Sequence, residues 1–249
     1  MSDNTFESIL PQSVVAQLGG PVAKKLLPEY GAVFAAGGEA VPPDRLIFDD
    51  EADVDRFQQS VEIGAVEFDE ITIELQRPAA EALRIAATAS RSQGRSITPR
   101  SVDSGRRRFG DTIELWLSRV APALVHWVRE GKIGHAQADE IRALRPVDQV
   151  TRVFELEERG LWFARDVSKS IIYSVAPPGA SQHLSMLAFD VTEFGEPAVR
   201  KVLAEHFWFQ TVVSDLPHFT YLGMPESELS GAGLKRIVHL DRPFWVPDI

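Results

Sequence analysis

The chain has 249 residues, 44% of them hydrophobic, with a formal net charge of −10 and no cysteine. This length and apolar content suffice for one large domain, or for a core domain with an N-terminal extension. The lack of cysteine excludes disulfides, thiol catalysis and cysteine-based zinc sites, so histidine and carboxylate side chains are the available zinc ligands. The acidic balance disfavours a general nucleic-acid or anionic-membrane surface, and no nucleic-acid partner is expected.

Membrane insertion and export signals are not evident in the sequence. No run approaches 18 consecutive apolar residues, so no transmembrane segment is expected. The start, Met-Ser-Asp-Asn-Thr-Phe-Glu, has neither a basic region nor an apolar region of the kind a signal peptide needs. The default expectation is therefore a cytoplasmic location.

Residues 1–65 are expected to form a mainly irregular and helical N-terminal extension. The helical spacing of apolar residues over 13–27 is interrupted by Gly-Gly-Pro at 19–21, which predicts a broken helix or two short helices. The acidic run at 49–55 is typical of a helix start or a solvated face. It lacks the ligand pattern of a calcium loop.

The remaining elements follow from periodicity and from helix start and stop signals. We expect helices over 78–93, 109–130, 135–144, 148–160 and 197–206. We expect strands within 66–76, over 170–175, over 187–191, within the aromatic run 207–213 and from residue 218 onward.

Two stretches hold side chains suited to metal binding. His183 lies in a loop, Asp190 follows in a predicted strand, and His218 opens another, with Asp215 three residues before it. Catalytic zinc usually takes three ligands from histidine and carboxylate and leaves a fourth position to water, which a free carboxylate can deprotonate. A non-haem iron site uses similar ligands but usually shows a His-x-Asp or His-x-Glu signature, whereas six residues intervene here, so zinc is favoured. The other histidines are interpreted as structural: His126, His135, His206 and His239.

Arginines are concentrated between the first two long helices, in a loop that ends in the sequence Ser104-Gly105-Arg106-Arg107-Arg108. Arginine can hold a planar carboxylate with two parallel hydrogen bonds, so this loop is a candidate anion site. The alternative is that these arginines cap a helix or pair with surface carboxylates.

A family resemblance rests on these same residues. Ser-x-His-x6-Asp with Ala188 before the Asp, preceded by Pro-Pro-Gly and followed by acid-x-x-His-Phe-x-Tyr-x-Gly, resembles the M15 zinc peptidases. That family includes D-Ala-D-Ala carboxypeptidases and dipeptidases of the bacterial cell wall. The resemblance covers about residues 96–223 and implies that His183, Asp190 and His218 bind zinc and that Asp215 is the catalytic base.

The resemblance also implies residues for substrate binding. The Ser-Gly-x-Arg segment of the family is similar to Ser104–Arg107, which favours Arg107 as the residue that holds the substrate's terminal carboxylate. Arg100 is the competing candidate, and Ser181 is expected to hydrogen-bond the substrate.

Two positions depart from the family pattern. The family usually has Gly where Met186 stands and Glu where Asp215 stands. The ordinary pKa of Asp is only about 0.4 units below that of Glu, so Asp215 is chemically able to act as a base. Its reach is shorter by roughly 1.5 Å, and a misplaced base can cost about 10²-fold in rate.

The sequence thus predicts an α+β protein in which a small antiparallel sheet carries a zinc site and helices pack on one side. The peptidase-like domain is expected to span residues 66–249 and to hydrolyse peptidoglycan stem peptides, as a D-Ala-D-Ala carboxypeptidase. The alternative is a weak or inactive zinc-binding relative that recognises peptides or cell-wall fragments. The resemblance implies work at the cell envelope if a signal was removed.

Overall fold

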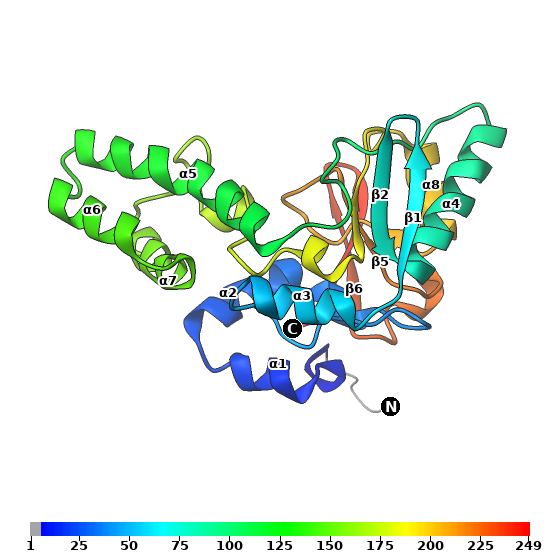
Figure 1. Cartoon of the computed structure of the whole chain (residues 1–249), viewed down its shortest axis with the longest axis horizontal. Coiled ribbons are helices and arrows are strands. Elements are labelled where there is room, and N and C mark those ends of the chain that lie inside the picture. The colour runs from blue at the N-terminus through cyan, green and yellow to red at the C-terminus, as the bar shows by residue number, and fades with distance from the viewer. Residues whose placement is uncertain (1–5) are drawn as a thin grey trace. The chain divides into compact units, whose positions relative to one another are not determined.

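A computed structural model describes residues 6–249 as a mixed α+β protein, with eight α-helices and three small antiparallel sheets among them (Figure 1). The helices are α1 (Gln12–Gln17), α2 (Pro21–Tyr30), α3 (Glu51–Gln59), α4 (Arg77–Ser92), α5 (Phe109–Arg129), α6 (His135–Ala143), α7 (Pro146–Glu157) and α8 (Pro197–Glu205). The strands are β1 (Ile63–Phe68), β2 (Ile71–Gln76), β3 (Ala188–Asp190), β4 (Trp208–Phe209), β5 (His218–Tyr221), β6 (Leu234–His239) and β7 (Arg242–Pro247). The predicted fold class is confirmed.

The chain divides into two compact units. The first contains the described residues up to Leu46, together with Asp55–Arg107 and Gln182–Ile249, and the second contains Ile47–Val54 and Arg108–Ser181. All the strands belong to the first unit. The boundary expected between residues 65 and 66 concerns the extent of the family-like domain and stays a prediction.

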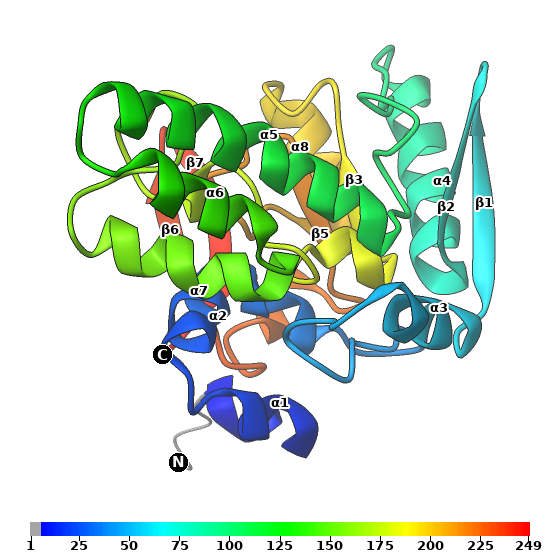
Figure 2. The same ribbon diagram turned by 60° about the vertical axis from the view of Figure 1, so that its left-hand side comes forward.

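The helices before the central sheet form as their sequence patterns predict, whereas the single strand predicted within 66–76 is a hairpin of β1 and β2. Helices α1 and α2 are separate, and Pro21 occupies the first turn of α2, where its missing N–H costs no intrahelical bond. In Figures 1 and 2 the β1–β2 hairpin lies along α4, and the two contact each other. The apolar stripe of α4, including Leu83 and Ala86, is buried as predicted.

A three-stranded antiparallel sheet, in the order β3-β5-β4, forms the centre of the first unit. Its register places Asp190 opposite His218, and Phe189 opposite Phe219. Because side chains alternate between the faces of a strand, His218 and Phe219 project to opposite sides of the sheet. On the phenylalanine side, Phe189 packs edge-on against Trp208 with ring centroids 6.1 Å apart. The predicted strands at 187–191 and from His218 are confirmed.

The second unit is built on α5, α6 and α7, which lie side by side in Figure 2. Helix α5 continues through Pro122 to Arg129 and buries Trp116, whose Nε1 donates to Gln149 Oε1 at 3.1 Å. The three helices predicted in this region are confirmed. No helix among residues 6–249 is both long enough and apolar enough to cross a membrane.

The strand predicted over 170–175 is wrong. Residues Ile171–Tyr173 form a 3₁₀ helix, closed by a bond from Ser174 N to Ile171 O. The carboxylate of Glu157 accepts hydrogen bonds from Ser170 Oγ and from Ile171 N, at 2.5 and 2.7 Å. The second unit supplies no strand for pairing among its described residues, so the β-branched residues are buried in a capped turn instead.

Candidate metal centre

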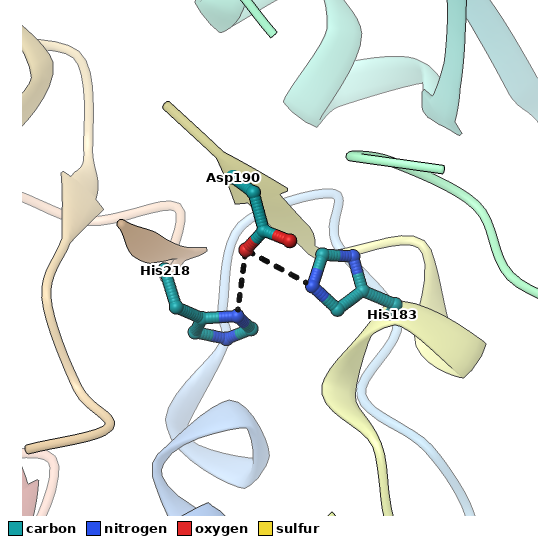
Figure 3. Close-up of side chains that lie close together, drawn as sticks. All are labelled: His183, Asp190 and His218. Atoms are coloured by element: carbon teal, nitrogen blue, oxygen red, sulfur yellow. Dashed lines mark ion pairs between the residues drawn. The ribbon is translucent and has the colours of Figure 1, made fainter. Parts of the chain in front are cut away.

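Three side chains of the first unit converge at one end of the central sheet (Figure 3). His183 comes from the 3₁₀ helix η4 (Gln182–Ser185), Asp190 from the end of β3 and His218 from the start of β5. The strand register sets Asp190 opposite His218, and η4 lies just before β3 in the chain. All three are buried, and one ligand atom from each lies within 4.8 Å of the others.

Asp190 stands between the two imidazoles. Its Oδ1 lies 3.3 Å from His183 Nε2 and 3.3 Å from His218 Nδ1. The two rings meet edge to face, with centroids 4.9 Å apart and an interplanar angle of 76°. Both imidazoles therefore direct one nitrogen at the same carboxylate oxygen, as Figure 3 shows.

The hydrogen bonds of the other ring nitrogens indicate which tautomers are present. His183 Nδ1 lies 2.8 Å from the carbonyl oxygen of Gly105, which can only accept, so Nδ1 carries the proton. His218 Nε2 lies 2.9 Å from Gln182 Oε1, while Gln182 Nε2 donates to the carbonyl of Tyr30. His218 Nε2 is thus also the protonated nitrogen. Both nitrogens that face Asp190 are left with lone pairs.

Three electron-pair donors therefore meet without a proton among them. His183 Nε2 and Asp190 Oδ1 are buried and make no hydrogen bond within the described residues. Buried polar atoms in folded proteins nearly always have a partner, and a carboxylate facing two imidazole lone pairs is repulsive unless a cation lies between them. The donor set, two neutral imidazoles and one carboxylate, fits a metal ion. The predicted group of metal-binding residues is therefore brought together by the fold.

The charge states agree with this arrangement. Burial lowers the pKa of His183, and the positive charge of Arg107 lowers it further, so the imidazole is held neutral. The guanidinium of Arg107, 2.8 Å from Asp190 Oδ2, favours the ionised form of that carboxylate. Neutral imidazole and ionised carboxylate are the forms that bind metals.

Arg107 holds the outer oxygen of the same carboxylate. Its Nη2 lies 2.8 Å from Asp190 Oδ2, and its Nε donates to the carbonyl of Asp103 at 3.0 Å. Only 14% of the Arg107 side chain is exposed. The guanidinium thus orients Asp190 so that Oδ2 is engaged and Oδ1 faces the histidines. Whether Arg107 also binds a substrate stays a prediction.

Two residues that hydrogen-bond the histidines, Gln182 and Gly105, were not predicted from the sequence. Gln182 connects His218, Thr220 Oγ1 and the backbone of Tyr30. Gly105 packs so closely on β2 that a Cβ atom there would lie 2.6 Å from Ile73 Cγ2, and this close approach aims its carbonyl at His183. The sequence features that could have identified these two residues are the position of the glutamine next to His183 and the position of the glycine inside the segment Ser104–Arg107.

A third supporting residue lies far away in the sequence. The amide of Gln58, which is buried in α3, donates to the carbonyls of Arg107 and Leu184 at 2.9 and 3.1 Å. It also accepts from Arg106 Nε at 2.6 Å. Gln58 therefore ties the arginine segment to η4. No sequence signal marks it, because the contact joins residues separated by 126 positions.

The other predicted site residues lie outside this cluster. Asp215 is exposed in the turn before β5, where its backbone carbonyl accepts from His218 N, and its carboxylate makes no hydrogen bond within residues 6–249. Arg100 donates its backbone N–H to Asp190 O, and its guanidinium lies 5.9 Å from the centre of the Phe194 ring. Ser181 is buried just before η4. Their catalytic and substrate-binding roles stay predictions.

Met186, where the family usually has glycine, adopts a left-handed backbone conformation with φ of 57°. This conformation is costly for any residue with a Cβ atom. The backbone of this chain therefore has the shape that glycine favours, although a methionine occupies the position and is fully buried.

Comparisons of the chain with models of known protein families, with curated proteins and with solved structures find no match.

Proposed function

We propose that this protein is a zinc-dependent peptidase that hydrolyses a peptide bond in the stem peptides of peptidoglycan, as a D-Ala-D-Ala carboxypeptidase. The observation that carries the proposal is the meeting of three electron-pair donors, His183 Nε2, His218 Nδ1 and Asp190 Oδ1, in a buried site. The resemblance of their sequence context to the M15 peptidases supplies the reaction and the substrate class.

Zinc suits this donor set. Two imidazoles and one carboxylate are a common ligand group of catalytic zinc, which keeps a fourth position open. When bound, zinc supplies a Lewis acid for the scissile carbonyl and lowers the pKa of a coordinated water toward about 7. In this chain, His183 and His218 are oriented by hydrogen bonds to Gly105 and Gln182, and such supporting contacts typically tune metal affinity.

The remaining roles belong to side chains around the cluster. Asp215 takes a proton from the attacking water and returns it to the leaving amine. Its carboxylate is exposed and has no hydrogen-bonding partner among the described residues, so it is available for proton transfer. Arg107 or Arg100 holds the terminal carboxylate of the substrate, with Ser181 as a further hydrogen-bonding residue. Arg107 already contacts Asp190, whereas Arg100 forms no ion pair within residues 6–249.

A second candidate function is a zinc-binding module that recognises peptides or cell-wall fragments without cleaving them. Two observations favour it: the shorter base at Asp215, and the methionine in a left-handed conformation at Met186. Both are departures from the family pattern, and each lies three residues in sequence from a candidate ligand, Asp215 before His218 and Met186 after His183.

The test is zinc content together with release of D-alanine from a muramyl pentapeptide. Wild type, Asp215→Ala and Asp215→Glu are compared, with Asp139→Ala on the exposed face of α6 as the matched control. We expect one zinc per chain in all four proteins, turnover in wild type and the control, and a loss of at least about 10²-fold in Asp215→Ala. Zinc without turnover in either wild type or Asp215→Glu would favour the recognition module. Absence of zinc would contradict both functions.

A further inference from the structure

A cavity of the second unit lies between one face of α5 and the loop that follows α7. It has a volume of about 600 Å³, within the range of small-molecule pockets, about 300–1,000 Å³. The loop contributes residues 164–167 to its wall. The residues of α5 that line it are spaced so that they share one face of the helix: Ser118, Arg119, Pro122, Ala123 and His126.

Two arginines of the lining converge on one hydroxyl group. Arg119 Nε donates to Ser174 Oγ at 3.0 Å, and the backbone N–H of Arg165 donates to the same oxygen at 3.4 Å. Burial lowers the pKa of Arg119, and the nearby positive charge of Arg165 lowers it further. Two like charges are thus held at the same cavity, an arrangement that is repulsive unless an anion lies between them.

No carboxylate within residues 6–249 pairs with either arginine. The guanidinium of Arg165 forms no hydrogen bond there, and Arg119 Nη1 donates only to the hydroxyl of Ser118 at 2.8 Å. The one acid of the lining, Asp166, accepts instead from Ser168 N, at 3.3 Å within its own turn. In a chain of net charge −10, the cavity therefore has a local excess of positive charge.

His126 adds a third donor two turns along α5 from Arg119. Its Nδ1 lies 3.3 Å from Arg129 Nη2, which can only donate, so Nδ1 accepts and the ring proton is on Nε2. Neither His126 Nε2 nor Arg119 Nη2 has a hydrogen-bond partner within residues 6–249, and neither is a buried atom. Both N–H donors are therefore accessible to a ligand. The sequence alone favoured a structural role for this histidine.

The loop wall of the cavity has a strained backbone. Val167 has a φ of 51°, a left-handed conformation that is rare for a β-branched residue. Its N–H donates to Ala164 O at 2.9 Å, and Ala164 N donates to Lys169 O at 3.1 Å, so the turn is fixed by its own hydrogen bonds. Strain of this kind gathers at functional sites, and here it shapes the segment that carries Arg165.

We propose that this cavity binds the phosphate monoester group of a small organic molecule. The phosphate has close to two negative charges and three acceptor oxygens, which match two guanidinium groups and His126 Nε2. A carboxylate has one charge and two coplanar oxygens, so it leaves one cation uncompensated. The organic part packs on the apolar surfaces of Pro122 and Val167. The site shares no residue with the metal cluster, so the inference does not rest on the proposed peptidase function.

The experiment is calorimetric titration of the full chain at slightly alkaline pH, where a phosphate monoester is a dianion. The probes are phenyl phosphate, inorganic phosphate and benzenesulfonate, which has the same ring and a tetrahedral group of single charge. We expect phenyl phosphate to bind at least about 10-fold more tightly than benzenesulfonate, because only the dianion compensates both arginines. It should also bind more tightly than inorganic phosphate, because its ring covers apolar surface.

Two variants test the arginines. Arg165→Gln is expected to weaken binding of phenyl phosphate at least about 5-fold, on the order of a lost charge-assisted hydrogen bond. The guanidinium of Arg165 is exposed and makes no contact that the fold depends on, so misfolding is an unsuitable explanation for this loss. Arg159→Gln removes the same charge from an exposed position outside the cavity and should leave the affinity unchanged.

Several results would overturn the proposal. No binding at millimolar concentration would do so, as would equal affinity for phenyl phosphate and either of the other probes. An unchanged affinity in Arg165→Gln, or equal losses in Arg165→Gln and Arg159→Gln, would show that no local site is involved. Loss of binding after treatment with a zinc chelator would place the phosphate at the metal centre instead, whereas binding that survives the chelator supports the cavity.

Discussion

Arg107 Nη2 lies 2.8 Å from Asp190 Oδ2, whereas Oδ1 of the same carboxylate lies 3.3 Å from a nitrogen of each cluster histidine. The two oxygens of Asp190 therefore have different surroundings. The guanidinium compensates the charge of one oxygen and fixes its direction, and the other is directed at the imidazole lone pairs. An arginine expected to bind substrate is thus also a support for a residue of the candidate metal cluster.

Replacement of Arg107 by alanine is expected to lower zinc affinity about 10–100-fold, because Asp190 loses the partner that orients it. Competition with a chromophoric chelator measures this affinity. Arg100→Ala is the control and should bind zinc as wild type does, since Arg100 contacts Asp190 only through its backbone. An unchanged zinc affinity in Arg107→Ala would restrict Arg107 to a role in substrate binding or surface pairing.

Gln182→Ala should affect both metal binding and stability. The substitution removes the acceptor that holds the proton on His218 Nε2, and it leaves the buried Tyr30 carbonyl and Thr220 hydroxyl short of a partner. We expect zinc affinity to fall about 10–100-fold and the free energy of unfolding to fall by about 1–3 kcal/mol. Urea denaturation measures the second quantity. Gln93→Ala, at an exposed position after α4, should change stability by less than about 0.5 kcal/mol; a similar loss in both variants would contradict the assignment.

At most positions a protein with alanine is more stable than the same protein with glycine, but at Met186 we expect this order of stability not to hold. Both substitutions remove a buried side chain and should destabilise the protein. Glycine, however, avoids the cost of about 1–2 kcal/mol that a residue with a Cβ atom carries at φ of 57°. Against this gain stands a loss of about 0.4–1 kcal/mol, because glycine gives the unfolded chain more conformational entropy than alanine does. Met186→Gly should therefore be as stable as Met186→Ala or more stable, by up to about 1 kcal/mol in urea denaturation.

Leu203 serves as the control position for the comparison at Met186. At Leu203, inside α8, alanine should be more stable than glycine by about 1 kcal/mol. If alanine is more stable than glycine by the same amount at both positions, the left-handed conformation of Met186 carries no appreciable strain.

In the second unit, Glu157→Gln should lower the free energy of unfolding by about 1–3 kcal/mol. The carboxylate accepts hydrogen bonds from Ser170 Oγ and Ile171 N, whereas an amide offers only one oxygen to these two donors. Glu155→Gln, on an exposed part of the same helix, should cost about 0.5 kcal/mol or less, because its ion pair with Arg152 is at the surface. Equal stability of Glu157→Gln and wild type would show that the turn at 171–173 does not depend on this contact.

Several features of the protein were determined by the sequence alone. The helices from α4 to α8 follow from apolar periodicity and from prolines and glycines at their ends, which act within a few residues. The residues of the candidate metal cluster were also predictable, because the available ligand types are few and their spacing resembles a known motif. The two short strands that carry Asp190 and His218 were predicted as well, but the register that places these two residues opposite each other was not.

Other features were decided only by tertiary structure. Residues 170–175 have the composition of a strand, but no strand of their unit pairs with them and Glu157 caps them as a 3₁₀ turn. The tautomers of the histidines depend on the carbonyl of Gly105 and the amide of Gln182, which reach them only after the chain has folded. The second oxygen of Asp190 is engaged by a residue 83 positions away. Local patterns specify which atoms are available as ligands, and long-range contacts decide which lone pairs those atoms present.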